Sequence, residues 1–270
     1  MRIGLLCEED ELPVEPLGYF HYRGDKYPHW GNPRGRNKTV DYEVGKFNRF
    51  AKLGVIADEI ESMLIENLNN DFDSVDGKCS YACLLMMIHG IRVGNEDSAE
   101  GYESGLEHMG NVGELVQTYG VTTLLNKHIK VVDDIIHLHF LGKTQVEHHI
   151  KIADENLVKF GKMYLHGHEQ EKWIGIEYGE LFDFIKINIG DAFIPKDLRT
   201  FCANINAWNV VNMYLRKAKR DTKTEVNEEI KRITEIVASR LGNTPSITKS
   251  NYIDNRMFDW FKAKRLKADE

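Results

Sequence analysis

Apolar residues recur at helical spacing along the first third of the chain. They fall at Phe47, Phe50, Leu53, Val55, Ile56, Ile60, Met63, Leu64 and Leu68. This period predicts one or two amphipathic helices over residues 41–69. A polar break at 71–77 follows, and the mainly apolar run 78–90 then predicts a buried helix that ends just before Arg92. The same spacing predicts further helices at about 178–188, 196–218, 224–240 and 255–266.

A period of two appears in the middle of the chain. Apolar and polar residues alternate over 134–139 and again over 145–152, and Gly142-Lys143-Thr144 lies between them. Alternation on both sides of a turn predicts a β-hairpin, with Lys143 at its tip. A strand is also expected within residues 121–130. The predicted fold class is therefore α+β and mostly α, a helical domain with one small sheet or hairpin.

The amino-terminal part has a different character. Residues 1–16 are acidic and contain two prolines, so we expect a poorly ordered or edge segment. Residues 19–42 mix aromatic and basic side chains with glycine and proline, which predicts irregular or short-stranded structure. Loop and short helix are expected over 94–110. We therefore expect a short amino-terminal segment at 1–44 and a main domain at 45–270.

The composition is that of an ordinary globular chain, with 42% apolar and 29% charged residues among 270. No apolar run is long enough to cross a bilayer, and the start lacks a signal peptide's apolar region, so we expect a cytoplasmic protein with no membrane partner. The net charge of −7 argues against binding to nucleic acid. That charge is uneven, however. Residues 211–270 hold fourteen basic and nine acidic residues, and residues 21–49 hold seven and three, so two basic ends could form a positive groove.

The candidate chemistry lies in five polar residues: Arg92, Lys143, Arg199, Asn243 and Tyr252. A tyrosine can attack phosphorus, although a phenol with a pKa of about 10 needs help to lose its proton. The guanidinium fork of arginine matches the oxygens of a phosphate, and an amide can donate to them. A lysine on a turn can reach into a groove and protonate a leaving oxygen. Together these residues supply the parts that metal-free attack on a phosphodiester requires.

Each of these residues alone has a plainer interpretation. Tyr252 could be an ordinary core or surface tyrosine, and Arg92 could cap the preceding helix through the helix dipole. Lys143 could be a solvated turn residue, and Arg199 an ion-pair partner near a helix start. Residues 242–245, Gly-Asn-Thr-Pro, could be a helix stop and turn. The order of the five residues along the chain, and the sequence around each of them, distinguish the catalytic interpretation from these structural ones.

Five segments, taken in order, resemble the type IB DNA topoisomerases of the small poxvirus and bacterial kind. They are Ile91-Arg92-Val93-Gly94-Asn95-Glu96; Gly120-Val121-Thr122-Thr123-Leu124 with Asn126-Lys127-His128-Ile129; Phe140-Leu141-Gly142-Lys143-Thr144; Lys196-Asp197-Leu198-Arg199-Thr200; and Leu241-Gly242-Asn243-Thr244-Pro245-Ser246 with Ser250-Asn251-Tyr252-Ile253. The resemblance covers roughly residues 75–260. It implies the helical catalytic fold that these enzymes share with tyrosine recombinases.

The resemblance also implies a function, the relaxation of supercoiled double-stranded DNA without ATP. Tyr252 would form a 3′-phosphotyrosyl link to the cut strand, which rotates and is then rejoined. Arg92, Arg199 and Asn243 would stabilise the transition state. Lys143 would protonate the leaving 5′ hydroxyl, and Lys196 would lie beside the phosphate. Further DNA contacts are expected at Tyr22, Tyr27, Trp30, Arg34, Arg36, Lys38, Asn126, Lys127 and Lys249.

Two features depart from the family pattern. Asn243 stands where the poxvirus enzymes have histidine and bacterial relatives have asparagine, which can still donate to a phosphate oxygen. Family members also carry a separate β-rich domain that closes on DNA, and only residues 1–44 are available for it here. A reduced clamp predicts weaker binding, or help from a protein partner, for an enzyme otherwise expected to act as a monomer on DNA.

Three other functions fit less well. A tyrosine recombinase usually has histidine three residues before the second arginine, where this chain has Lys196. A DNA-binding relative without catalysis would not need the five-residue set. A metal-dependent nuclease would need clustered carboxylates, which we do not find.

No cofactor or metal ion is expected. Cys79 and Cys83 share a helix face without further ligands at matching spacing, so buried structural thiols are expected. The hairpin histidines are His137, His139, His148 and His149. His137 and His139 share a face that could hold a metal, but solvent-facing positions or contacts beside DNA are the preferred interpretation.

Overall fold

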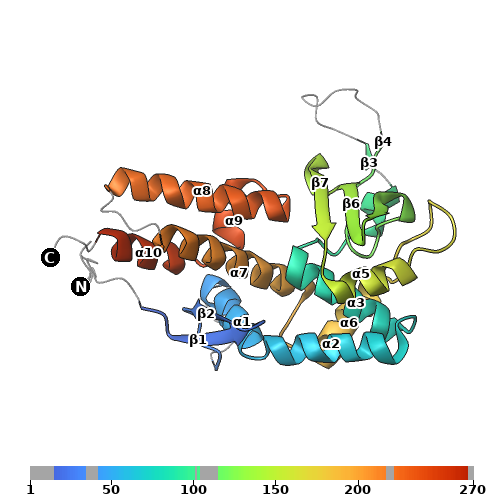
Figure 1. Cartoon of the computed structure of the whole chain (residues 1–270), viewed down its shortest axis with the longest axis horizontal. Helices are drawn as coiled ribbons and strands as arrows, with labels where there is room; N and C mark the ends of the chain where they lie inside the picture. Colours follow the sequence, from blue (N-terminus) through green and yellow to red (C-terminus); the bar gives the residue numbers. More distant parts are fainter. Residues whose placement is uncertain (1–14, 35–41, 101, 104–114, 217–221, 267–270) are drawn as a thin grey trace, which may run out of the picture.

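Helix α7 (Pro195–Leu215) runs through the middle of the molecule, and four other helices pack against it (Figure 1). These are α1 (Tyr42–Val55), α3 (Val75–His89), α8 (Lys223–Leu241) and α10 (Arg256–Leu266). The computed structural model describes residues 15–34, 42–100, 102–103, 115–216 and 222–266. Most of α7 is buried, including Arg199, Asn204 and Asn206, so these polar side chains need partners inside the protein.

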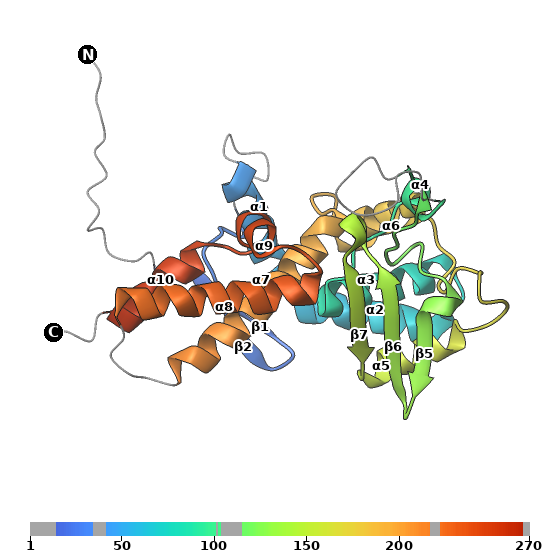
Figure 2. The same cartoon turned by 90° about the horizontal axis from the view of Figure 1, so that it is seen from above.

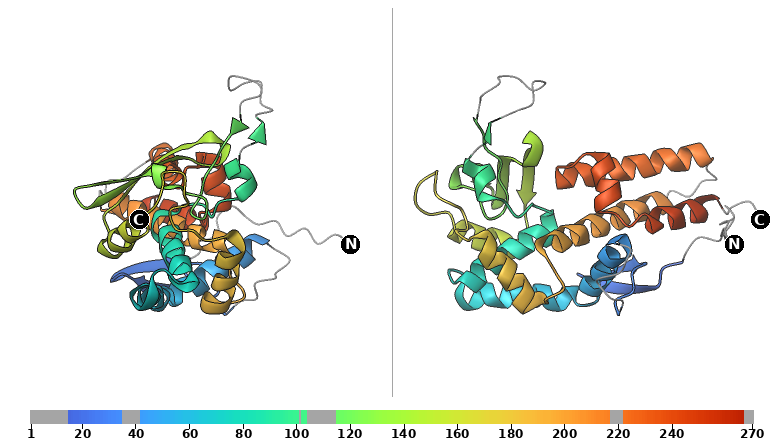
Figure 3. Two further views of the ribbon diagram at one scale, coloured as in Figure 1. Left: turned by 90° about the vertical axis from the view of Figure 1, so that its right-hand side faces the viewer. Right: turned by 180° about the vertical axis from the view of Figure 1, so that it is seen from behind.

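The other helices form two groups beside α7. They are α2 (Ala57–Asp71), α4 (Glu96–Glu100), α5 (Glu155–Met163), α6 (Tyr178–Phe184) and α9 (Pro245–Asn251), and α6 continues as a π-helical turn at Ile185–Ile189. Helices α2, α5 and α6 pack on α3 at one end, whereas α9 packs on α8 at the other (Figure 3). The helices predicted over 41–69, 178–188, 196–218, 224–240 and 255–266 are confirmed; the first is divided into α1 and α2.

Helix α3 is buried on nearly every side, as its apolar sequence predicts. It starts earlier than expected, because the Ser74 side chain accepts a hydrogen bond from the Gly77 amide and caps the helix. It ends at Gly90, whose φ of 66° is the left-handed conformation that glycine adopts easily. The chain therefore turns sharply here and delivers Arg92 close to the centre of the molecule.

The hairpin prediction is confirmed and extended by a third strand. Strands β5 (Ile129–Val132), β6 (Ile135–Leu141) and β7 (Glu147–Ile152) form an antiparallel sheet in that order. Strand β7 lies nearest to α7 and α8 (Figure 2). One sheet face is buried and carries Ile136, Leu138, Phe140, His148 and Ile152, whereas the other faces solvent.

The strand expected within 121–130 is largely wrong, because only its end belongs to β5. The amides of Val121 and Thr122 donate to the carbonyls of Arg92 and Val93, at 2.7 and 2.8 Å. Residues 126–128 form a short 3-10 helix instead. The backbone of this segment thus holds the Arg92 loop and is not free to join the sheet.

The amino-terminal residues form a hairpin of two short strands, β1 (Gly18–Tyr22) and β2 (Asp25–His29), as the composition predicted. Phe20, Tyr22 and Tyr27 of this hairpin belong to the main core, whereas Tyr19 is exposed. Helix α1 spans the expected boundary between residues 44 and 45, and the division into two parts stays a prediction. Residues 1–14 lie outside the described residues.

Two helices escaped sequence analysis. Helix α5 begins at the Asp154 cap, whose carboxylate accepts from the amides of Asn156 and Leu157. Helix α9 begins at Thr244, which caps it, with Pro245 in its first turn. Gly242 ends α8, so the Gly-Asn-Thr-Pro segment does contain a helix stop, and its Thr-Pro part then starts α9.

The segment 94–110 contains a short helix and one short strand. The short helix expected within 94–110 is α4. Strand β3 (Tyr102–Glu103) also lies in this segment and pairs with β4 (Leu115–Val116). Residues 101 and 104–110 are outside the described residues.

Cys79 and Cys83 are buried free thiols, and burial raises the pKa of both, as expected for structural cysteines. Within the part of the chain that the structure describes, no helix has the length and apolarity needed to cross a membrane.

Candidate active site

Tyr252 lies directly after α9 and is held by its backbone. Its amide donates to the Thr248 carbonyl at 3.0 Å, and its carbonyl accepts from Asn204 on α7 at 2.8 Å. The other end of the Asn204 amide accepts from the Asp254 amide at 2.9 Å. Because Asn204 is buried and uses both ends of its side chain, the position of Tyr252 is fixed relative to α7.

Arg199, one turn before Asn204, joins three parts of the site. Its guanidinium donates to the Gly90 carbonyl at 2.6 Å, the Leu241 carbonyl at 2.8 Å and the Tyr252 hydroxyl at 3.2 Å. The first two carbonyls end α3 and α8, where a cation is favoured. Burial lowers the pKa of Arg199 to about 10, opposed by Tyr252 and aided by Arg92. The side chain is therefore still a cation at neutral pH.

Arg92 and Asn243 form a second contact in the site. Arg92 Nη2 donates to Asn243 Oδ1. Since arginine can only donate, this contact fixes the amide so that Nδ2 is left as a donor. Asn243 Nδ2 and Arg92 Nε are both buried, and neither has a hydrogen-bond partner within the described structure. A buried donor is costly unless it meets an acceptor oxygen, so both atoms are available to oxygens of a ligand or of water.

The backbone around Arg92 and Asn243 depends on close packing. A Cβ on Gly120 would lie 2.4 Å from the Gly94 nitrogen, so the Arg92 loop and its neighbour meet backbone to backbone. Gly242 has a φ of 58° and ends α8 in the left-handed conformation. These constraints place Asn243 opposite Arg92.

Lys143 begins a short 3-10 turn, Lys143–Gln145, between β6 and β7. It is exposed and lines the pocket beside Arg92. The hairpin is anchored next to it, because the Tyr119 amide donates to the Leu141 carbonyl at 2.8 Å. The predicted lysine at the hairpin tip is thus confirmed in position.

His148 is a site neighbour whose burial contradicts the expected solvent-facing position, while the alternative of a contact beside DNA stays a prediction. Its ring is buried, stacks on Phe140 at 4.7 Å between centroids, and would lie 2.1 Å from a Cβ on Gly242. Burial first, then Arg199 and Arg92, lower its pKa to about 4, so the ring is neutral at neutral pH. Strand alternation was the missed signal, because His148 shares its face with Ile150 and Ile152.

Two further charged residues support the site from α1. Lys46 is only 2% exposed, and its Nζ lies 3.5 and 3.3 Å from the carbonyl oxygens of Ser250 and Asn251, at the end of α9. Arg49 donates to both carboxylate oxygens of Asp197, which caps α7. The signal for Lys46 was its place on the apolar face of a predicted helix.

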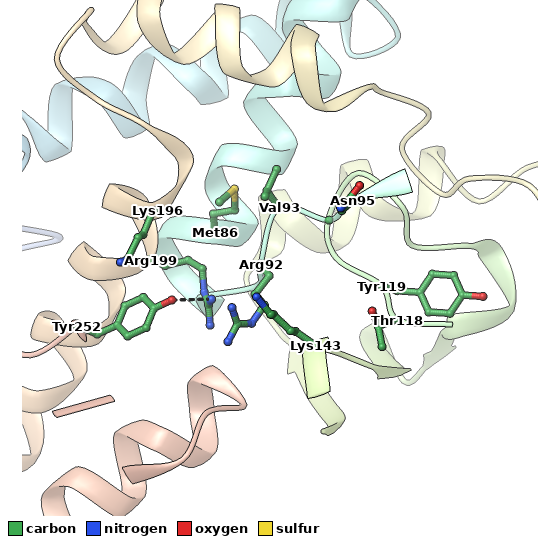
Figure 4. Close-up of a pocket in the computed structure, with 11 residues that line it drawn as sticks. Met86, Arg92, Val93, Asn95, Thr118, Tyr119, Lys143, Lys196, Arg199 and Tyr252 are labelled. Atoms are coloured by element: carbon green, nitrogen blue, oxygen red, sulfur yellow. Dashed lines mark hydrogen bonds between the residues drawn. The ribbon is translucent and has the colours of Figure 1, made fainter. Parts of the chain in front are cut away.

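The side chains surround a pocket of about 500 Å³. Figure 4 shows the Tyr252 hydroxyl directed at Arg199, with Arg92 and Lys143 beside them. Lys196 Nζ lies 5.6 Å from the centroid of the Tyr252 ring. Among the described residues, four cations and no carboxylate line this pocket. Its chemistry suits a phosphate group next to a nucleophilic hydroxyl.

Three of the DNA contacts predicted outside the pocket are buried in the structure. Tyr22, Tyr27 and Trp30 are buried, which corrects their prediction as DNA contacts. Phe201 packs against Tyr22 and Trp260 against Trp30, so these aromatic rings belong to the core.

The remaining predicted contacts stay predictions. Arg34, Lys127 and Lys249 are exposed. The Asn126 amide donates to the carbonyls of His166 and His168, which braces a loop. Arg36 and Lys38 lie outside the described residues.

Comparison with known proteins assigns the chain to a family. Residues 36–269 match the model of the eukaryotic DNA topoisomerase I catalytic core. A protein named DNA topoisomerase 1B from Acanthamoeba polyphaga mimivirus is 23% identical over 233 residues. That match covers 82% of this chain and 65% of the viral protein. Since the family match extends over most of the chain, the chain belongs to the family of the eukaryotic DNA topoisomerase I catalytic core.

Proposed function

We infer that this protein is a type IB DNA topoisomerase, which relaxes double-stranded DNA through a 3′-phosphotyrosyl intermediate. The observation that carries the proposal is the pair of buried donors without partners in the described structure, Asn243 Nδ2 and Arg92 Nε. Both residues line a cationic pocket that Tyr252 also lines. Family membership and the name of the viral relative support the same function.

In the proposed first step, the Tyr252 oxygen attacks the phosphorus of one strand. A bond forms between the phenol oxygen and phosphorus, and the bond from phosphorus to the 5′ oxygen breaks. The phenol proton passes to solvent water, and Lys143 donates a proton to the leaving 5′ oxygen. Arg92, Arg199 and Asn243 donate hydrogen bonds to the non-bridging oxygens, where negative charge gathers in the transition state.

The second half of the reaction reverses the first. The cut strand rotates about the intact strand, and the free 5′ hydroxyl then attacks the phosphotyrosine. The phosphotyrosine keeps the energy of the broken bond, so the cycle needs no ATP. One chain supplies Arg92, Lys143, Arg199, Asn243 and Tyr252, which supports action as a monomer on DNA.

The test is relaxation of negatively and positively supercoiled plasmid in EDTA without ATP. We expect the protein to relax both substrates, because strand rotation removes supercoils of either sign. Relaxation that requires added metal or ATP would contradict the proposed chemistry. Binding without relaxation would favour a relative that has lost catalysis.

Lys143→Ala is expected to slow cleavage by about 10²–10⁴-fold, because the leaving 5′ oxygen loses its acid. The measurement is single-turnover cleavage of an oligonucleotide duplex. A substrate with sulfur at the 5′ bridging position should restore the rate, since a thiolate leaves without protonation. Lys151→Ala is the matched control, because Lys151 is exposed on the same hairpin and does not line the pocket. Equal defects on both substrates would remove Lys143 from this role.

A further inference from the structure

The solvent face of the sheet carries a compact group of three potential metal ligands: His139, Glu147 and His149. Their nearest ligand atoms all lie within 4.8 Å of one another. The Nε2 atoms of His139 and His149 lie 2.6 and 3.5 Å from Glu147 Oε1. This group belongs to the face of the hairpin that is turned away from His148 and the core.

The strand register explains why the three side chains meet. His139 on β6 is paired directly with His149 on β7, and their rings stack with centroids 4.2 Å apart. Glu147 lies two residues before His149, so it projects from the same face of β7. The arrangement therefore follows from a regular ladder and needs no special loop geometry.

Ordinary surface pairing is a weak reason for this group to form. The side chains are 57–66% exposed, and ion pairs between exposed side chains contribute little to stability.

We propose that His139, Glu147 and His149 bind a divalent transition-metal ion of the zinc class. Two imidazoles and one carboxylate are a donor set that Zn²⁺ takes with distances of about 2.0–2.2 Å, with water at the fourth position. Mg²⁺ and Ca²⁺ prefer oxygen ligands, so they would bind this group poorly. The ligand atoms already lie within 4.8 Å of one another, and exposed side chains are free to rotate toward these distances.

The bound ion would join the two hairpin strands beside the turn that carries Lys143. Glu147 is the first residue of β7, and the turn ends at Gln145. The ion would lie on the opposite sheet face from His148, so it would not touch the reacting phosphate. Its role would be to restrain the hairpin, and the relaxation expected in EDTA would persist without it.

The test is calorimetric titration of Zn²⁺ into metal-free protein whose affinity tag has been removed. We expect one equivalent to bind, and we expect His139→Ala, His149→Ala and Glu147→Gln each to weaken binding at least about tenfold. That figure is a lower bound, because even groups that only support a ligand contribute about 10–100-fold. Co²⁺ should give a visible absorption spectrum of low-symmetry coordination in the wild type and not in these three ligand variants.

His137→Ala is the matched control, because His137 lies on β6 and shares the outer face without belonging to the group. It should leave the affinity unchanged. Absence of saturable binding in the wild type, or equal binding by all variants, would overturn the proposal. Equal loss in His137→Ala would assign the binding to dispersed surface histidines and would also overturn it. None of these outcomes bears on plasmid relaxation, so the metal site and the proposed reaction are tested separately.

Discussion

Tyr252→Phe is expected to abolish plasmid relaxation while leaving duplex binding and the fold intact. The substitution removes one oxygen, the proposed nucleophile, and no other pocket residue carries a phenol placed beside Arg199. Loss of a nucleophile removes the covalent pathway, so the rate should fall by at least about 10³-fold. The phenylalanine ring still fills the space of Tyr252, which is 5% exposed.

The measurement compares relaxation, covalent adduct formation and duplex affinity for wild type and variant. Tyr178→Phe is a suitable control, because Tyr178 is exposed on α6 and does not line the pocket. It should relax plasmid at the wild-type rate. Residual adduct formation by Tyr252→Phe would identify another nucleophile. Loss of duplex affinity would mean that the hydroxyl holds DNA in addition to attacking it.

Some of the site follows from local sequence signals. Arg92 follows an apolar helical run, and Lys143 lies between two alternating segments. Both patterns involve only neighbouring residues, so they predicted the positions of these two side chains correctly. The contact between Arg92 and Asn243 joins residues 151 positions apart. No periodicity reports such a contact, and only the packing of α3 against α7 and of α7 against α8 brings the two together.

The wrong site predictions arose where the amino-acid composition of a segment was given more weight than the spacing of its apolar residues. Aromatic and basic residues over 19–42 suggested a DNA-binding surface. Alternation along β1 turns Tyr22 into the core, and Tyr27 begins a run of three buried residues in β2. The same alternation distinguishes buried His148 from exposed His149. Lys46 was counted only as charge, although its helical position placed it among buried residues.

Arg199→Ala is expected to reduce cleavage by roughly 10³–10⁵-fold, the range for an arginine that stabilises a phosphoryl transition state. Arg199→Lys should recover only part of this loss. Lysine keeps the charge but cannot reproduce the planar fork that reaches Gly90, Leu241 and Tyr252 together. The measurement is single-turnover cleavage, made well below the melting temperature of each variant.

Stability must be separated from chemistry in this experiment, because Arg199 also pairs two buried carbonyls. Each carbonyl left unpaired costs about 1–3 kcal/mol, so Arg199→Ala should melt at a lower temperature. Arg265→Met is the matched control. Arg265 is 6% exposed and donates to the Tyr214 carbonyl at 2.6 Å, yet it does not line the pocket. It should lose stability and keep the cleavage rate of the wild type. If both variants lost cleavage in proportion to their stability, Arg199 would be a structural residue, and Arg92 with Asn243 would be left to stabilise the transition state.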